Sequence, residues 1–120
     1  MIKDVDKIIE EYKSYAVNHW KASCEGDHKS ANRYYTKLTK LYNIFLENDE
    51  IKQSALVLLL NDNNYAVQNW ASAHCLGLGY MEKEAEDTLI VIVNLTPNEA
   101  PSFEAKMTLK VWKEKGTLTF

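Results

Sequence analysis

Apolar side chains recur every three or four positions along most of this chain. In the first segment they fall at Val5, Ile8, Ile9, Tyr12, Ala16 and Trp20. A second segment repeats the spacing at Ala31, Tyr34, Tyr35, Leu38, Leu41, Tyr42, Phe45 and Leu46. This is the periodicity of one face of an α-helix. The pattern predicts two long helices separated at Gly26, with Asp27 as the N-cap of the second.

The next apolar stretch is a continuous run, Leu56-Val57-Leu58-Leu59-Leu60. A run of this kind also suits a buried strand. Leucine dominates it and β-branched residues do not, which favours a third helix over 51–60, surrounded on most of its sides. The polar residues 61–64 then predict a turn that offers caps for the next helix.

The sequence after residue 64 predicts three more helices. Helical spacing from Val67 to Leu78 ends at two glycines, and a fifth helix is expected over about 80–95. The second half of that helix, 89–93, has the composition of a strand, so a strand is the alternative there. Ser102 is expected to cap a sixth helix that Gly116 closes.

Six helices with short connections predict antiparallel neighbours. The alternation of helices and short turns is typical of a degenerate array of helix pairs. No linker or low-complexity stretch interrupts it, so we expect an all-α fold in a single domain, 1–120. The low numbers of glycine and proline, 4 and 2 among 120 residues, agree with long helices.

The net charge and the cysteine content argue against several classes of function. The formal net charge is −3, and general nucleic-acid binding needs a clustered basic surface, so a nucleic-acid partner is not expected. The two cysteines, Cys24 and Cys75, are too few for a disulfide framework and suit a reducing compartment. No signal peptide and no apolar run long enough to span a membrane is recognised. The expected location is the cytoplasm.

Two stretches carry a resemblance to a known family. Residues 59–74 resemble the second helix of a HEAT-like repeat: an aliphatic pair, a polar turn with Asp62, then Val67 and small residues at Ala71 and Ser72. Gln68 stands where that pattern has a basic residue. With residues 102–116, whose Ala105, Leu109, Trp112 and Gly116 follow in the family's order, the chain is similar to the DUF2019 type of small bacterial proteins of unknown function.

This resemblance covers about residues 50–118. It implies antiparallel helix pairs stacked as a short HEAT-like α-α superhelix, without an assigned activity. Similar small HEAT-like proteins act as immunity proteins beside bacterial toxins, which extends to this chain by analogy of fold alone.

Candidate chemistry is sparse. His74 and Cys75 are adjacent, but neighbouring helix residues point about 100° apart, so we expect both in the core rather than in a catalytic pair. His19, Cys24 and His28 have spacings that suit zinc, but Gly26 is expected to break the helix between the last two. No glycine-rich nucleotide loop is present. We therefore expect no catalytic residues, no metal and no cofactor, and do not expect an enzyme.

Partner binding is the leading hypothesis. Tyr34, Tyr35 and Tyr42 form an aromatic band wider than one helix can bury, and tyrosine tolerates a wet edge. Glu82 and Glu86 share a helix face and are candidates for docking a basic protein. The leading function is a protein–protein interaction module, in its more specific form an immunity-type inhibitor of a bacterial toxin. The alternatives are a HEAT-like protein acting on nucleic acid and a structural, oligomeric domain.

Overall fold

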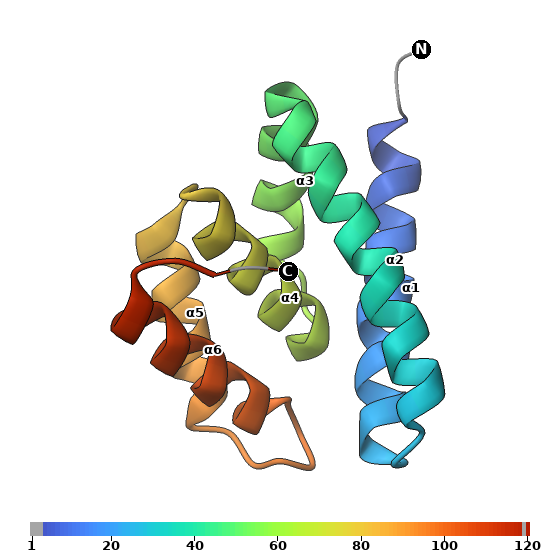
Figure 1. Ribbon diagram of the computed structural model, residues 1–120, viewed down its shortest axis with the longest axis vertical. Helices are drawn as coiled ribbons and strands as arrows, with labels where there is room; N and C mark the ends of the chain where they lie inside the picture. The colour runs from blue at the N-terminus through green and yellow to red at the C-terminus, as the bar shows by residue number, and fades with distance from the viewer. Residues whose placement is uncertain (1–3, 119) are drawn as a thin grey trace. The chain divides into compact units, whose positions relative to one another are not determined.

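The computed structural model describes residues 4–118 and residue 120 (Figure 1). These residues form six α-helices, and no strand occurs among them. The predicted all-α class is therefore confirmed. The chain divides into two compact units, Met1–Leu59 and Leu60–Phe120.

The first unit begins with two helices of equal length, α1 (Val5–Cys24) and α2 (His28–Glu47), which pack against each other. Gly26 has a φ of 72°, the left-handed conformation that glycine adopts without a steric cost, and it reverses the chain as predicted. The carboxylate of Asp27 accepts a hydrogen bond from the backbone N–H of Ser30 at 3.1 Å. This confirms Asp27 as the N-cap of α2.

The interface between α1 and α2 is formed by the apolar stripes of the two helices. Tyr12 and Ala16 of α1 are buried, as are Leu38 and Phe45 of α2. The rings of Tyr12 and Phe45 have centroids 6.1 Å apart, in a tilted arrangement. Aromatic pairs at this separation add to the free energy that their burial alone provides.

The leucine-rich run forms α3 (Asp49–Leu60), which Asn48 caps by accepting a hydrogen bond from the N–H of Ile51 at 3.0 Å. Leu56, Leu59 and Leu60 are buried, whereas Leu58 is 59% exposed and Val57 is exposed as well. The helix is therefore confirmed, but the expectation that it is surrounded on most sides was wrong. Its apolar residues occupy two faces, and only one of them is buried.

The second unit contains α4 (Tyr65–Leu78), α5 (Glu82–Val93) and α6 (Ser102–Lys115). Helix α5 packs against both α4 and α6, and α4 also contacts α6. Ten of the fourteen residues of α4 are buried, and α4 contacts both of the other helices of this unit. Packing of helices that follow one another along the chain is the arrangement that an array of helix pairs has.

The ends of these three helices test the sequence-based boundaries. Asn64 accepts a hydrogen bond from the N–H of Ala66 at 2.8 Å, so the polar turn caps α4 as predicted. Ser102 was wrongly predicted as the cap of α6: it is the first helical residue, and Pro101 occupies the cap position without a side-chain hydrogen bond. Proline has a fixed φ that suits a helix start, so the helix begins there without a polar cap.

The segment with strand-like composition is helical. Leu89 and Ile92 are buried at a spacing of three, whereas Ile90 and Val91 are exposed. Packing of one face against α4 and α6 therefore outweighs the β-propensity of these residues. Among the residues described, no helix combines the length and the apolar character that crossing a membrane requires.

Ser72 and Asn69 are two of the buried polar side chains of the second unit. Ser72 is fully buried and Asn69 is nearly so, and neither the Ser72 hydroxyl nor the Asn69 Oδ1 has a hydrogen-bond partner among the described residues. A buried polar group without a partner costs about 1–3 kcal/mol.

We therefore expect Ser72→Ala to raise the free energy of unfolding by about 1 kcal/mol, because it removes a buried hydroxyl that makes no hydrogen bond. Urea denaturation measures this. Ser54→Ala is the matched control, since Ser54 is an exposed helical residue of α3 and gains the same helix propensity. Equal effects of the two substitutions would show that the buried hydroxyl costs nothing.

Candidate functional site

A group of aromatic and basic side chains lies on the surface that α1 and α2 share. Tyr15 of α1 and Tyr34 of α2 have ring centroids 6.3 Å apart, and both side chains are half-buried. The turn at Gly26 makes the two helices antiparallel, so residues at similar separations from the turn come to lie side by side (Figure 1). Tyr15 and Tyr34 meet for this reason.

Two cations stack on these rings. The Arg33 guanidinium carbon lies 5.4 Å from the centre of the Tyr34 ring, and the Lys37 ammonium nitrogen lies 5.3 Å from the centre of the Tyr15 ring. Each contact of this type contributes about 0.5–1 kcal/mol at an exposed site. The contacts restrict two long side chains that would otherwise move freely. We call Tyr15, Arg33, Tyr34 and Lys37 the α1–α2 cluster.

Tyr15 keeps its hydroxyl proton in this setting. Its burial, followed by the nearby Glu11 carboxylate, raises the pKa of Tyr15 above its ordinary value. The Tyr15 hydroxyl donates a long hydrogen bond of 3.5 Å to the Glu11 Oε2. The cluster therefore presents a neutral phenol beside two permanent positive charges.

The predicted tyrosines differ in their exposure. Tyr35 is 39% exposed and Tyr34 is half-buried, whereas Tyr42 is only 7% exposed. Burial raises the pKa of Tyr42 above its ordinary value. The spacing explains this, because Tyr42 follows Leu38 by four positions and shares its buried stripe. Part of the Tyr34 and Tyr35 side chains is thus exposed to solvent, whereas Tyr42 is almost wholly buried.

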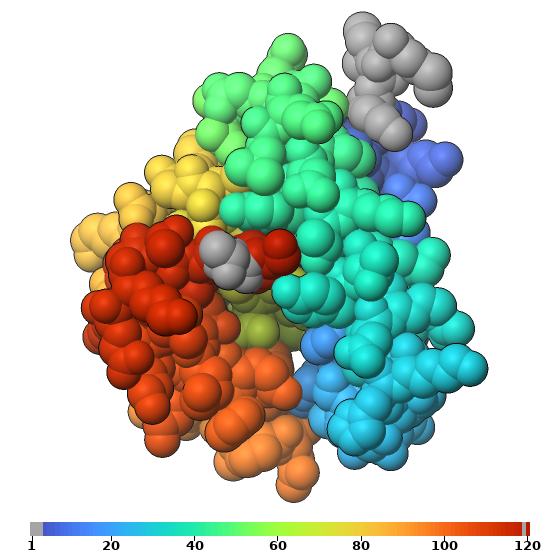
Figure 2. All heavy atoms as spheres, in the orientation of Figure 1, coloured from blue at the N-terminus to red at the C-terminus, as the bar shows by residue number. Residues whose placement is uncertain are grey.

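The outward side of α2 is basic over most of its length. Lys29, Arg33 and Lys40 are exposed and Lys37 is half-buried, at spacings of three and four that form one row. The first turn of α2 has no acidic residue. Figure 2 shows the atoms of α2 exposed along one face of the molecule, in cyan to green.

The predicted acidic pair lies in the other unit, at the start of α5. Glu82 is exposed and Glu86 is half-buried, and neither forms an ion pair within the described part of the chain. The neighbouring Lys83 pairs instead with Asp87, at 3.4 Å between Nζ and Oδ2. Acidic residues in the first turn of a helix interact favourably with its dipole, which gives Glu82 a structural reason to be there.

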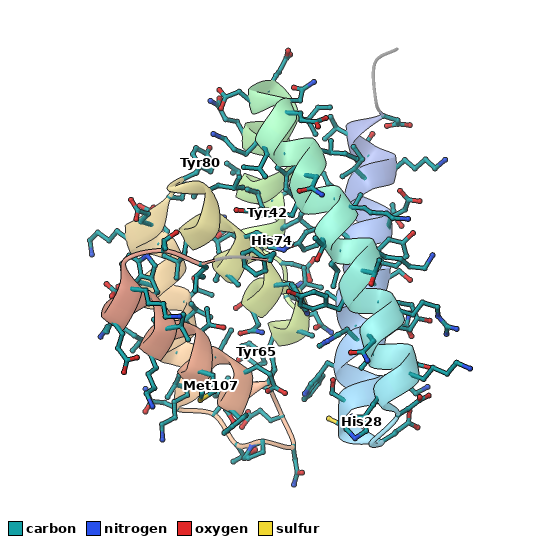
Figure 3. All side chains as sticks on the ribbon, in the orientation of Figure 1. His28, Tyr42, Tyr65, His74, Tyr80 and Met107 are labelled. Atoms are coloured by element: carbon teal, nitrogen blue, oxygen red, sulfur yellow. The ribbon has the colours of Figure 1, made fainter. Side chains whose placement is uncertain are left out.

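His74 and Cys75 lie in the core as predicted, whereas Cys24, which packing was expected to bury, is exposed. His74 and Cys75 are fully buried, and the His74 ring makes edge contacts with the rings of Trp70 and Phe120, with centroids 5.5 and 4.9 Å apart. Figure 3 labels His74 on α4 and His28 beside the turn between α1 and α2. Cys24 and His28 are both exposed, with the end of α1 between them. No three potential metal ligands are grouped together in the described ranges.

Sequence reasoning did not select Tyr15, Arg33 or Lys37 as site residues. Tyr15 lies beside the stripe that runs through Tyr12 and Ala16 rather than within it, so periodicity alone does not select it. A usable signal was the turn at Gly26, because Tyr15 and Lys37 lie at equal separations from it on either side. Folding the sequence about that glycine places them together.

No family model, curated protein or solved structure significantly matches this chain. The similarity to the DUF2019 type therefore remains a prediction from residues 50–118.

Proposed function

We propose that this protein is a non-enzymatic protein–protein interaction module that binds its partner through the α1–α2 cluster and the adjacent Tyr35. The observation that supports this most is the stacking of Arg33 and Lys37 on the rings of Tyr34 and Tyr15. Side chains that are already ordered lose less entropy on binding, and tyrosine and arginine are enriched where binding energy is concentrated.

The charge of this surface indicates the chemistry of the partner. The row of Lys29, Arg33, Lys37 and Lys40 suits an acidic protein surface, and an apolar or aromatic side chain of the partner could pack against Tyr35. This differs from the basic partner that the sequence suggested for Glu82 and Glu86. Those two residues remain the alternative docking site.

The more specific proposal is an immunity-type inhibitor of a bacterial toxin in the cytoplasm. Its support is the HEAT-like resemblance, together with two cysteines that are both free thiols. A toxin that acts on basic proteins could be neutralised by masking its acidic surface, which is the kind of partner that the α2 row suits.

The products of the adjacent genes are the natural binding partners to test. We expect one of them to bind the full chain, and Tyr34→Ala/Tyr35→Ala to weaken that binding about 30-fold or more, the effect of losing about 2 kcal/mol. Asn43→Ala is the control, because Asn43 is an exposed residue of α2 outside the cluster. Thermal unfolding of each variant shows that its fold is kept.

Two results would contradict this proposal. Binding that survives the double tyrosine substitution but is lost on Glu82→Ala/Glu86→Ala would move the site to α5. A complete lack of binding to any product of the adjacent genes would remove the immunity-type form of the proposal.

A second candidate function is binding to nucleic acid, and the row of four basic residues on α2 favours it. A protein that neutralises several phosphates loses affinity steeply as the salt concentration rises. A gel shift with single- and double-stranded DNA and RNA at two salt concentrations tests this. A salt-dependent shift that Arg33→Glu abolishes would favour nucleic acid over a protein partner.

A further inference from the structure

Helices α5 and α6 bury one side each in the second unit. Ala85, Leu89 and Ile92 of α5 are buried, as are Ala105 and Leu109 of α6, and both helices contact α4. Their opposite sides nevertheless carry large apolar residues. Side chains of this kind on an outer surface indicate an interaction site.

The apolar residues of this face lie near the loop that joins the two helices. Ile90 and Val91 are near the end of α5, and Phe103 and Met107 are near the start of α6. All four are exposed, and Phe103 most of all, at 67%. Figure 1 shows that the loop reverses the chain, so these four residues share one end of an antiparallel helix pair, and Figure 3 labels Met107 on α6.

On both helices, exposed charged residues follow the apolar ones toward the end that is remote from the loop. On α5, the exposed residues Val91, Asp87 and Glu84 follow one another at spacings of four and three, which form one line along a helix. On α6, Lys106, Lys110 and Lys113 are exposed at the same spacings, and no acidic side chain of the described part pairs with them. Lys83 of α5 pairs with Asp87, but Glu82, Glu84 and Glu86 keep this end of α5 net acidic, whereas Lys110 and Lys113 make the neighbouring end of α6 basic.

We propose that this α5–α6 face binds the same face of a second copy of the chain. A two-fold axis parallel to the two helices places α6 of one copy against α5 of the other. The apolar ends then meet each other, and each lysine line faces an acidic line. Such a self-complementary contact closes after two subunits.

The mixed charge explains why a second copy suits this face better than other partners. An anionic membrane would attract the lysines of α6 and repel Glu84 and Asp87 at the same time. A partner of one charge sign would meet the same conflict, whereas an identical face presents each sign opposite its complement. This proposal uses a surface other than the α1–α2 cluster and goes beyond the proposed function.

Size-exclusion chromatography with light scattering tests it on the full chain. The expected mass of the wild type rises with concentration toward twice the chain mass of 13.8 kDa. We expect Lys110→Glu/Lys113→Glu to be monomeric because acidic residues of α6 then face the acidic line of α5 on the other copy. Glu84→Lys/Asp87→Lys is expected to be monomeric because its face is then more basic. An equimolar mixture of the two variants should form a heterodimer, since opposite charges again meet.

Lys7→Glu/Lys21→Glu is the control, because it makes the same change of charge at exposed positions of α1. This control should leave the dimer intact. Phe103→Ser/Met107→Ser should abolish the dimer, because it removes the apolar end of the face. The helical circular dichroism signal of every variant should stay unchanged. A wild-type chain that stays monomeric at the highest concentration it reaches in solution would overturn the proposal. So would dimers that persist in both charge-reversed variants.

Discussion

Replacing Phe45 with alanine is expected to lower the free energy of unfolding by about 3–5 kcal/mol. Phe45 is almost completely buried, and its ring packs against that of Tyr12 between α1 and α2. Truncation removes this contact between the two helices and leaves a cavity. Since domains of this size are stable by about 5–15 kcal/mol, urea denaturation should show a much earlier midpoint.

Leu46→Ala is the control for this substitution. Leu46 follows Phe45 directly on α2, but its side chain is exposed. We expect a change within about 0.5 kcal/mol, as for other surface positions. Similar losses at the two positions would mean that α2 does not bury the face described above.

The stability of the protein should also fall as the solution becomes acidic, because of His74. Burial lowers the pKa of His74 from 6.5 to about 3 in the folded protein. The unfolded chain therefore binds a proton below about pH 6.5 that the folded chain does not bind. The contribution of neutral His74 is complete above that pH and is lost as the pH falls from 6.5 toward 3.

The expected loss is about 1.4 kcal/mol for each pH unit, or about 2 kcal/mol between pH 7 and pH 5. Urea denaturation at pH 7, 6 and 5 measures it. His74→Leu should remove most of this dependence, since leucine does not titrate. His28→Gln removes an exposed histidine and should leave the dependence as in the wild type. An identical pH dependence in His74→Leu and the wild type would show that His74 is not the group responsible.

The periodic pattern predicted the helices well, because a helix that buries one face needs apolar residues at every third or fourth position. All six helices were expected. The run through Ile90 and Val91 has the composition of a strand, but it is helical because Leu89 and Ile92 pack into the core of their unit. Residue types predicted the ends of the helices less well than the helices themselves. Ser102 looked like a cap by residue type, but Pro101 takes that position, because the path of the preceding loop decides which residue begins the helix.

The candidate site was harder to predict from the sequence than the helices were. Tyr34 and Tyr35 were selected as surface aromatics, but the cations above the rings depend on how α1 and α2 pair across the turn. The exposure of Leu58 was missed for a similar reason. Composition suggested that a run of five apolar residues is enclosed, whereas helical geometry turns Val57 and Leu58 away from the buried side.

The central claim is that the apolar runs of α1, α2, α3, α5 and α6 fold as helices with one buried face, which leaves the other face available for partners. Leu58 and Leu59 test it most directly, because they are chemically identical neighbours with exposures of 59% and 0%. We expect Leu59→Ala to lower the free energy of unfolding by about 2–5 kcal/mol and Leu58→Ala to change it by less than about 0.5 kcal/mol in urea denaturation. A strand would bury Leu58 together with Leu56 and Leu60 and expose Leu59, so the reverse order of the two losses would contradict the account.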